Sequence, residues 1–147
     1  MRAVYAEIEL INGNDLAFIR RGFMNNDEVK HARVNMLVDT RSTMLFINEH
    51  IQEQLQLPVW GTRQAQLSNG QIVTCKVVGP VELKFKNRDA ICRALVLPGN
   101  SVPILGLIPF QEMDVRIDLQ KHELIVNPDN PDFALMKLKK QLLAPTP

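Results

Sequence analysis

Short stretches in which apolar and polar residues alternate recur along the chain, and this pattern predicts a protein built mostly of β-strands. The alternation is clearest at 4–11, where charged and aromatic side chains separate apolar ones. A turn-forming sequence at 12–15 predicts a hairpin to a second strand at 16–19. After a polar loop, a strand is expected at 29–38, and its fully apolar end indicates that it enters the core.

The middle and the end of the chain continue this pattern. Asn69-Gly70 lies between two strand-like segments and is the strongest hairpin signal in the sequence. Gly79-Pro80 is expected to break the chain before the next strand. The strands expected in this part are 65–67, 72–73, 81–85, 91–97, 115–117 and 124–126.

Helices are considered in three segments of the sequence. Ile47, Ile51 and Leu55 recur every four residues and predict one short amphipathic helix that ends before Pro58. A second short helix is expected at about 107–113. Near the end of the chain, apolar residues at helical spacing lie among lysines, which suits either a docking helix or a frayed basic tail. The residues that carry this last spacing are Leu135, Leu138 and Leu142.

Composition narrows the class of protein. The 147 residues are 46% apolar, which suits a single domain, with a predicted boundary between 1–128 and a basic extension at 129–147. With 17 basic and 16 acidic residues, the net charge of +1 gives no electrostatic case for binding nucleic acid. Residues 1–10 lack the apolar run of a signal peptide and no stretch is as long as an apolar membrane span, so we expect neither secretion nor membrane insertion. Cys75 and Cys92 lack disulfide spacing, so we expect free thiols and a cytoplasmic location.

The most informative segment is 37–42, where an apolar strand runs directly into Asp39 and Thr40. Two facing carboxylates can share one proton, so that one acts as a base towards water and the other donates to a carbonyl oxygen. Asp114 and Asp118 have the sequence context of surface or capping acids, so neither is expected to face Asp39. We therefore expect the second carboxylate to come from another copy in a twofold homodimer.

This sequence resembles the retropepsin-like aspartic peptidases, specifically their small bacterial single-domain members, over about 4–128. The matching segments are 37–40, 47–57, 69–70, 102–106 and 114–119. The resemblance implies an all-β-dominated, closed β-barrel of the acid protease fold with one or two short helices, working as a homodimer. It also implies hydrolysis of peptide bonds by an aspartate from each subunit, with no metal and no cofactor.

The resemblance also implies roles for individual residues. Asp39 would be the catalytic aspartate. Thr40 would form hydrogen bonds to the other subunit, and Ser42 would form a hydrogen bond to the aspartate. The hairpin at 67–73 would be a flap that closes over substrate, and Leu105 and Gly106 would pack beneath the active loop. The substrate-binding residues implied in this way are Arg41, Ser68, Asn69, Gly70 and Gln71.

Arg41 is the departure from the family pattern, which is Asp-Thr-Gly. An arginine beside the aspartate would lower its pKa by roughly 1 to 3 units and favour the doubly ionised pair, which removes the general acid. Alternatively, Arg41 points to solvent or to an acid such as Glu49 and leaves a slow but working site. The sequence is compatible with both interpretations.

Other chemistry has little support in the sequence. His31, His50 and His122 have no ligand spacing, so no metal site is expected, and Trp60 is expected in the core or in dimer packing. The leading hypothesis is an endopeptidase that binds an extended peptide or protein substrate by strand addition. The rival hypotheses are an inactive relative that acts as a peptide-binding or structural dimer, and a monomeric strand-rich domain without a site.

Overall fold

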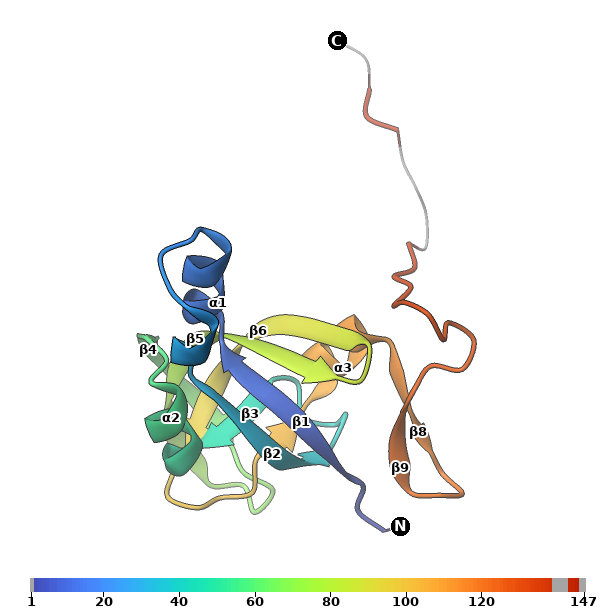
Figure 1. Cartoon of the computed structure of the whole chain (residues 1–147). Coiled ribbons are helices and arrows are strands. Elements are labelled where there is room, and N and C mark those ends of the chain that lie inside the picture. Colours follow the sequence, from blue (N-terminus) through green and yellow to red (C-terminus); the bar gives the residue numbers. More distant parts are fainter. Residues whose placement is uncertain (1, 139–142, 146–147) are drawn as a thin grey trace.

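The computed structural model describes residues 2–138 and 143–145, and within them the chain is mostly β-structure (Figure 1). The strands are β1 (Tyr5–Asn12), β2 (His31–Val38), β3 (Leu45–Asn48), β4 (Val59–Gln66), β5 (Ile72–Phe85), β6 (Arg88–Leu97), β7 (Ile104–Leu105), β8 (Val115–Asp118) and β9 (Glu123–Val126). The helices are α1 (Gly13–Arg20), α2 (Glu49–Leu55) and α3 (Leu107–Met113), with a 3₁₀ turn η1 (Asn26–Glu28). None of the helices in this part of the chain is long and apolar enough to cross a membrane.

Six of these strands form a closed barrel. They follow the order β1-β2-β7-β3-β6-β5, and pairing of β1 with β5 closes the ring. β4 pairs with the first half of β5 and lies outside the ring, while β8 and β9 form a separate two-stranded sheet. In Figure 1, the β8–β9 hairpin projects from the side of the barrel away from α2. The expected closed β-barrel is therefore confirmed, with three short α-helices instead of one or two.

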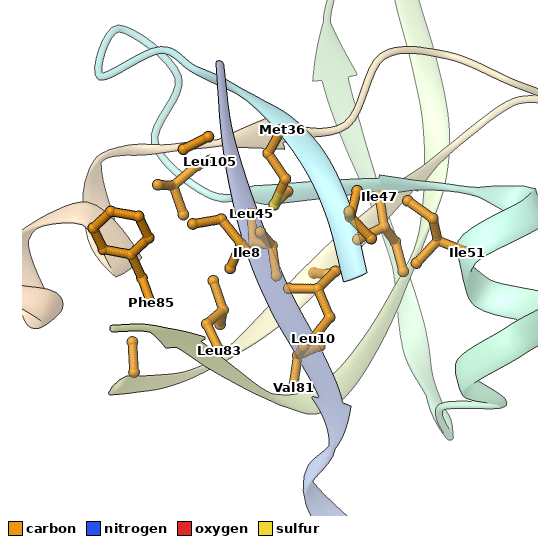
Figure 2. Packing of buried hydrophobic residues seen from close by; sticks show 14 of the residues in the cluster. Ile8, Leu10, Met36, Leu45, Ile47, Ile51, Val81, Leu83, Phe85 and Leu105 are labelled. Atoms are coloured by element: carbon orange, nitrogen blue, oxygen red, sulfur yellow. The ribbon is translucent and has the colours of Figure 1, made fainter. Parts of the chain in front are cut away.

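The core fills the inside of the barrel. Alternate residues of β1 and β2 are buried, and side chains such as Ile8, Leu10 and Met36 have no exposed surface. Figure 2 shows these side chains pointing towards Leu45 and Leu83 from other strands of the ring. Burial of an aliphatic side chain of this size contributes about 1.5–3 kcal/mol to the stability of the fold. Burial of these alternate side chains is therefore the main interaction that stabilises the closed barrel.

The predicted strand at 16–19 is wrong, because this segment belongs to helix α1. The side-chain oxygen of Asn12 accepts hydrogen bonds from the backbone N–H groups of Asn14 (3.0 Å) and Asp15 (3.1 Å). Asn12 thereby caps the helix, and its amide also donates to the carbonyl of Leu55 at 2.9 Å. The residues that favour a tight turn are also those that favour a helix N-cap, and here the cap forms.

Gly79-Pro80 does not end a strand as expected. β5 runs through it from Ile72 to Phe85, and the irregularity is absorbed as a bulge in the pairing with β6. The indole N–H of Trp60 donates to the carbonyl of Gly79 at 2.8 Å, while 64% of the Trp60 surface is exposed. The expectation that Trp60 lies in the core is therefore wrong.

Three of the elements expected in the second half of the chain are present in the structure. The Asn69-Gly70 hairpin, the helix at 107–113 and the β8–β9 pair are confirmed. At the end of the chain, residues 132–138 form no helix, and Leu142 of the expected helix lies outside the described residues. Cys75 and Cys92 are free thiols on neighbouring strands.

Candidate active site

The loop that follows β2 is held against the segment 103–108 by backbone hydrogen bonds. Asp39 N–H donates to the carbonyl of Leu105 at 3.1 Å, and Leu107 N–H donates to the carbonyl of Ser42 at 2.7 Å. β2 and β7 pair in parallel just before this point, so the strand enters the loop in a fixed register. These contacts place the Asp39 carboxylate at a defined position at the end of a core strand.

Gly106 is the residue that permits this close approach. A Cβ atom at Gly106 would lie 2.0 Å from the carbonyl oxygen of Met44 and 2.8 Å from that of Ser42. Its φ of −87° is accessible to any residue, so the requirement for glycine comes from space and not from backbone conformation. Leu105 is fully buried beneath the loop. Both residues therefore lie beneath the loop of Asp39.

The Asp39 carboxylate is occupied by Arg41 of the same loop. Arg41 donates to it three times, through its backbone N–H (3.0 Å to Oδ1), Nε (3.1 Å to Oδ1) and Nη2 (3.3 Å to Oδ2). The side chain of Asp39 is 20% exposed and that of Arg41 is 91% exposed. Of the two interpretations left open by the sequence, the direct contact between the arginine and the aspartate is the one found.

This contact changes the protonation of the site. The side-chain hydrogen bonds from Arg41 are the main cause of a lowered pKa of Asp39, and partial burial of the carboxyl opposes them. The same side-chain hydrogen bonds to Asp39 raise the pKa of Arg41. Arg41 is not among the residues with positive φ, so the loop accepts a side chain at this position without backbone strain. The replacement of glycine alters the charge of the site more than its backbone.

The neighbouring residues of the loop have different surroundings. Thr40 is exposed at the turn, where it is available to a partner molecule. Ser42 is half-buried and its backbone N–H donates to the carbonyl of Asp39 at 3.1 Å. The hydrogen bond between Ser42 and Asp39 is thus made by the main chain, while the carboxylate oxygens are bound by Arg41.

A cavity of about 600 Å³ opens beside the carboxylate. It lies between the loop, the residues that precede β1 and the β8–β9 hairpin. Leu119, at the turn of this hairpin, is 67% exposed, and Ile117 is half-buried. The cavity beside Asp39 therefore has an accessible apolar wall opposite the charged pair of Asp39 and Arg41.

The hairpin of β4 and β5 is attached to the strand that follows the active loop. Ala65 and Val73 from its two arms pack with Met44 and Phe46 against a small buried cluster of β5 and β6 that includes Cys75. Its turn is closed by the hydrogen bond from Leu67 N–H to the carbonyl of Gln71 at 2.8 Å. The proposed flap residues form this turn and are all exposed: Ser68, Asn69, Gly70 and Gln71.

The two other aspartates considered as partners of Asp39 have structural roles, as expected from the sequence. Asp114 ends α3, and its carboxylate accepts from the amide of Asn127 at 2.8 Å and lies 3.8 Å from the fully buried Arg88 guanidinium. Asp118 accepts from two backbone N–H groups of the β8–β9 turn. Neither carboxylate is hydrogen-bonded to Asp39 in the described part of the chain.

A closed β-barrel that presents an Asp-Thr loop beside a cavity, with a hairpin attached to the next strand, defines an aspartic peptidase-type domain. Residues 25–108 match the aspartyl protease family, and because this match covers more than half of the chain, the chain belongs to that family. The matched region contains the Asp39 loop, the hairpin and Gly106. The resemblance to the aspartic peptidases inferred from the sequence is therefore confirmed over these residues. No curated protein matches the chain.

Proposed function

We propose that this protein is an aspartic endopeptidase whose catalytic pair consists of Asp39 from each of two subunits. The observation that carries this proposal is the clamped Asp39 loop, which holds one carboxylate beside a cavity with an exposed apolar rim that includes Leu119. A single chain supplies one such carboxylate, and a twofold axis through the exposed Thr40 turn would supply the second.

In the proposed reaction, water attacks the carbonyl carbon of the scissile peptide bond. One Asp39 carboxylate takes a proton from the water, and the protonated Asp39 of the other subunit donates its proton to the carbonyl oxygen. A tetrahedral diol forms. Its C–N bond then breaks as the leaving nitrogen takes a proton from one Asp39 and a diol hydroxyl gives a proton to the other, which releases a carboxylic acid and an amine and restores the single shared proton. The peptide would lie extended under the hairpin turn at 68–71, where strand addition satisfies its backbone.

Arg41 has a predictable effect on this cycle. Because it lowers the pKa of Asp39, the pair holds its shared proton only at a lower pH than it would without the arginine. The rate should therefore decline as the pH rises, and it should decline at lower pH in the native protein than in Arg41→Gly. Loss of positioned acid catalysis lowers a rate by roughly 100 to 10,000-fold.

The Asp39–Arg41 pair also favours a second candidate function, an inactive dimer that binds peptides. The test is cleavage of a mixed peptide library from about pH 3 to pH 7, the range over which a shared-proton pair titrates. Native protein, Asp39→Asn and Arg41→Gly are compared, with sedimentation to measure the dimer. Turnover that disappears in Asp39→Asn supports the peptidase.

The other outcomes separate the remaining possibilities. Silence of the native protein with turnover by Arg41→Gly would mean a complete site inactivated by one side chain. Silence of both proteins with a stable dimer supports the binding module. A protein that remains monomeric at high concentration contradicts both functions.

A further inference from the structure

A second cavity has a volume of about 300 Å³. Its lining begins at Thr43, four residues after Asp39 in the sequence. It is lined by the loop, by β4, by β6 and by α3. The loop and α3 are joined here by a hydrogen bond from Ile108 N–H to the carbonyl of Thr43 at 2.9 Å. This cavity is therefore built on the same clamp that positions the aspartate.

The lining of this cavity is largely apolar. Met44 is half-buried, and Ile108 exposes 48% of its surface. Burial, with a smaller effect of the nearby Glu112 carboxylate, raises the pKa of the Cys92 thiol to about 12, so this group is uncharged at physiological pH. Glu112 itself accepts a hydrogen bond from the backbone N–H of Ile91 at 2.9 Å. This apolar wall can therefore contact the aliphatic part of a ligand side chain.

Two arginines, Arg63 and Arg93, border this apolar wall. Arg63 Nη1 lies 3.3 Å from the sulfur of Met44, and the Arg93 guanidinium lies 5.9 Å from the ring centre of Trp60. Neither forms an ion pair with a carboxylate of residues 2–138 or 143–145. Arginines that do form such pairs are Arg20, Arg33, Arg41, Arg88 and Arg116. An apolar pocket bordered by two guanidinium groups without an ion-pair partner in this part of the chain, and by one nearby carboxylate, Glu112, is complementary to a ligand side chain with an aliphatic portion and an anionic end.

The position of Arg63 indicates how such a ligand would arrive. Arg63 belongs to β4, which pairs with β5 on one side and has an open edge on the other within the described structure. Nearly every residue of β4 is exposed. An extended peptide can add to an open strand edge by main-chain hydrogen bonds, and alternate side chains of the added strand then point to the same side. Because Arg63 of β4 lines the pocket, the proposed peptide would run beside the pocket with one side chain directed into it.

We propose that this pocket binds a glutamate side chain of an extended peptide that lies along the open edge of β4. The two methylene groups of the glutamate contact Met44 and Ile108, and its carboxylate pairs with Arg63 and Arg93. This proposal rests on the proposed peptide-binding function and names the class of peptide that the site selects.

The test uses the full-length chain carrying Asp39→Asn, so that peptides are bound and not cleaved. The probes are fluorescent ten-residue peptides of Ala, Ser and Thr in which one Glu occupies each position in turn, with a matched set that carries Gln. Binding is measured by fluorescence anisotropy at low salt. We expect the Glu peptide to bind about tenfold more tightly than its Gln counterpart at one position, as charge-assisted hydrogen bonds imply.

The controls assign the preference to this pocket. It should disappear in Arg63→Gln/Arg93→Gln. It should persist in Arg21→Gln, which removes an exposed arginine that similarly lies 5.5 Å from the ring centre of Phe23. Equal binding of the Glu and Gln peptides at every position, or a preference that survives in the double variant, would overturn the proposal.

Failure of this inference is distinguishable from failure of the proposed peptidase. A Glu preference in a protein that cleaves nothing supports the pocket and refutes the catalysis. Cleavage by the native protein with no Glu preference in the binding assay refutes the pocket alone. If no peptide is bound at any position and none is cleaved, both proposals are wrong.

Discussion

Replacement of Gly106 by alanine tests whether the clamp beneath the active loop is as tight as its geometry implies. The added Cβ would lie 2.0 Å from the carbonyl oxygen of Met44, against a lower limit of 3.0 Å for real contacts, so the two segments must separate by about 1 Å. The φ and ψ of Gly106 are accessible to alanine, so no backbone strain contributes to the effect.

The size of the effect follows from what the separation breaks. The separation stretches the two backbone hydrogen bonds that hold the active loop. These are the 2.7 Å bond from Leu107 N–H to the carbonyl of Ser42 and the 3.1 Å bond from Asp39 N–H to the carbonyl of Leu105. Two hydrogen bonds at about 1 kcal/mol each, with about 1–3 kcal/mol for overpacking, give a loss of about 3–5 kcal/mol in the free energy of unfolding. For a domain of this length, that loss lowers the melting temperature by about 10 °C.

The assay is thermal unfolding followed by circular dichroism, with hydrogen exchange at the Leu107 amide as a local measure. Gly99→Ala is the matched control, since Gly99 has open space around it and a φ of +56°. That control should cost only about 1–2 kcal/mol for its left-handed backbone. If Gly106→Ala melts with the native protein and its Leu107 amide stays protected, the clamp does not require glycine and the reasoning fails.

The remaining predictions concern the half-buried Asp114 and the buried Asn12. Asp114→Asn should cost about 3 kcal/mol, because the buried Arg88 loses its carboxylate partner, whereas Asp118→Asn on a turn should cost less than about 1 kcal/mol. Hydrogen bonds, led by that from the Asn127 side chain, lower the pKa of Asp114 from 3.8 to about 2. The stabilisation that the ionised Asp114 gives to the folded state is therefore complete above pH 3.8 and is lost as the pH falls through about 2. Urea midpoints should therefore fall more steeply over this range in the native protein than in Asp114→Asn, and equal slopes would contradict the assignment. Asn12→Ala should lower the free energy of unfolding by about 2 kcal/mol through loss of the α1 cap, and a melting temperature equal to that of the native protein would show that the cap is dispensable.

The sequence predicted the barrel well because its signals are local and consistent. Alternating burial in β1 and β2, the Asn69-Gly70 turn and the spacing of Ile51 and Leu55 in α2 are each readable within a few residues. The segment 12–19 could not be assigned in this way, since its polar residues suit a turn and a helix cap equally. Gly79-Pro80 misled for a related reason, because a long strand can absorb such a pair as a bulge.

The candidate site was predictable in its residues but not in its contacts. The apolar strand before Asp39 indicated a positioned carboxylate, and the resemblance supplied the expected roles of its neighbours. The contact between Arg41 and Asp39 depends on one rotamer of a long side chain, so the sequence left it open beside Glu49. The pocket bordered by Arg63 and Arg93 was missed, because strands distant in sequence bring its lining together.

The ion pair within the loop has a consequence for how two copies would meet. Two bare carboxylates about 4 Å apart repel by about 4 kcal/mol at an effective dielectric constant of 20. Because each Asp39 already carries its own counter-ion in Arg41, two such loops would approach as neutral units. Association would then need no uptake of a proton, and protein concentration, rather than acidity, would govern how much of the proposed dimer forms.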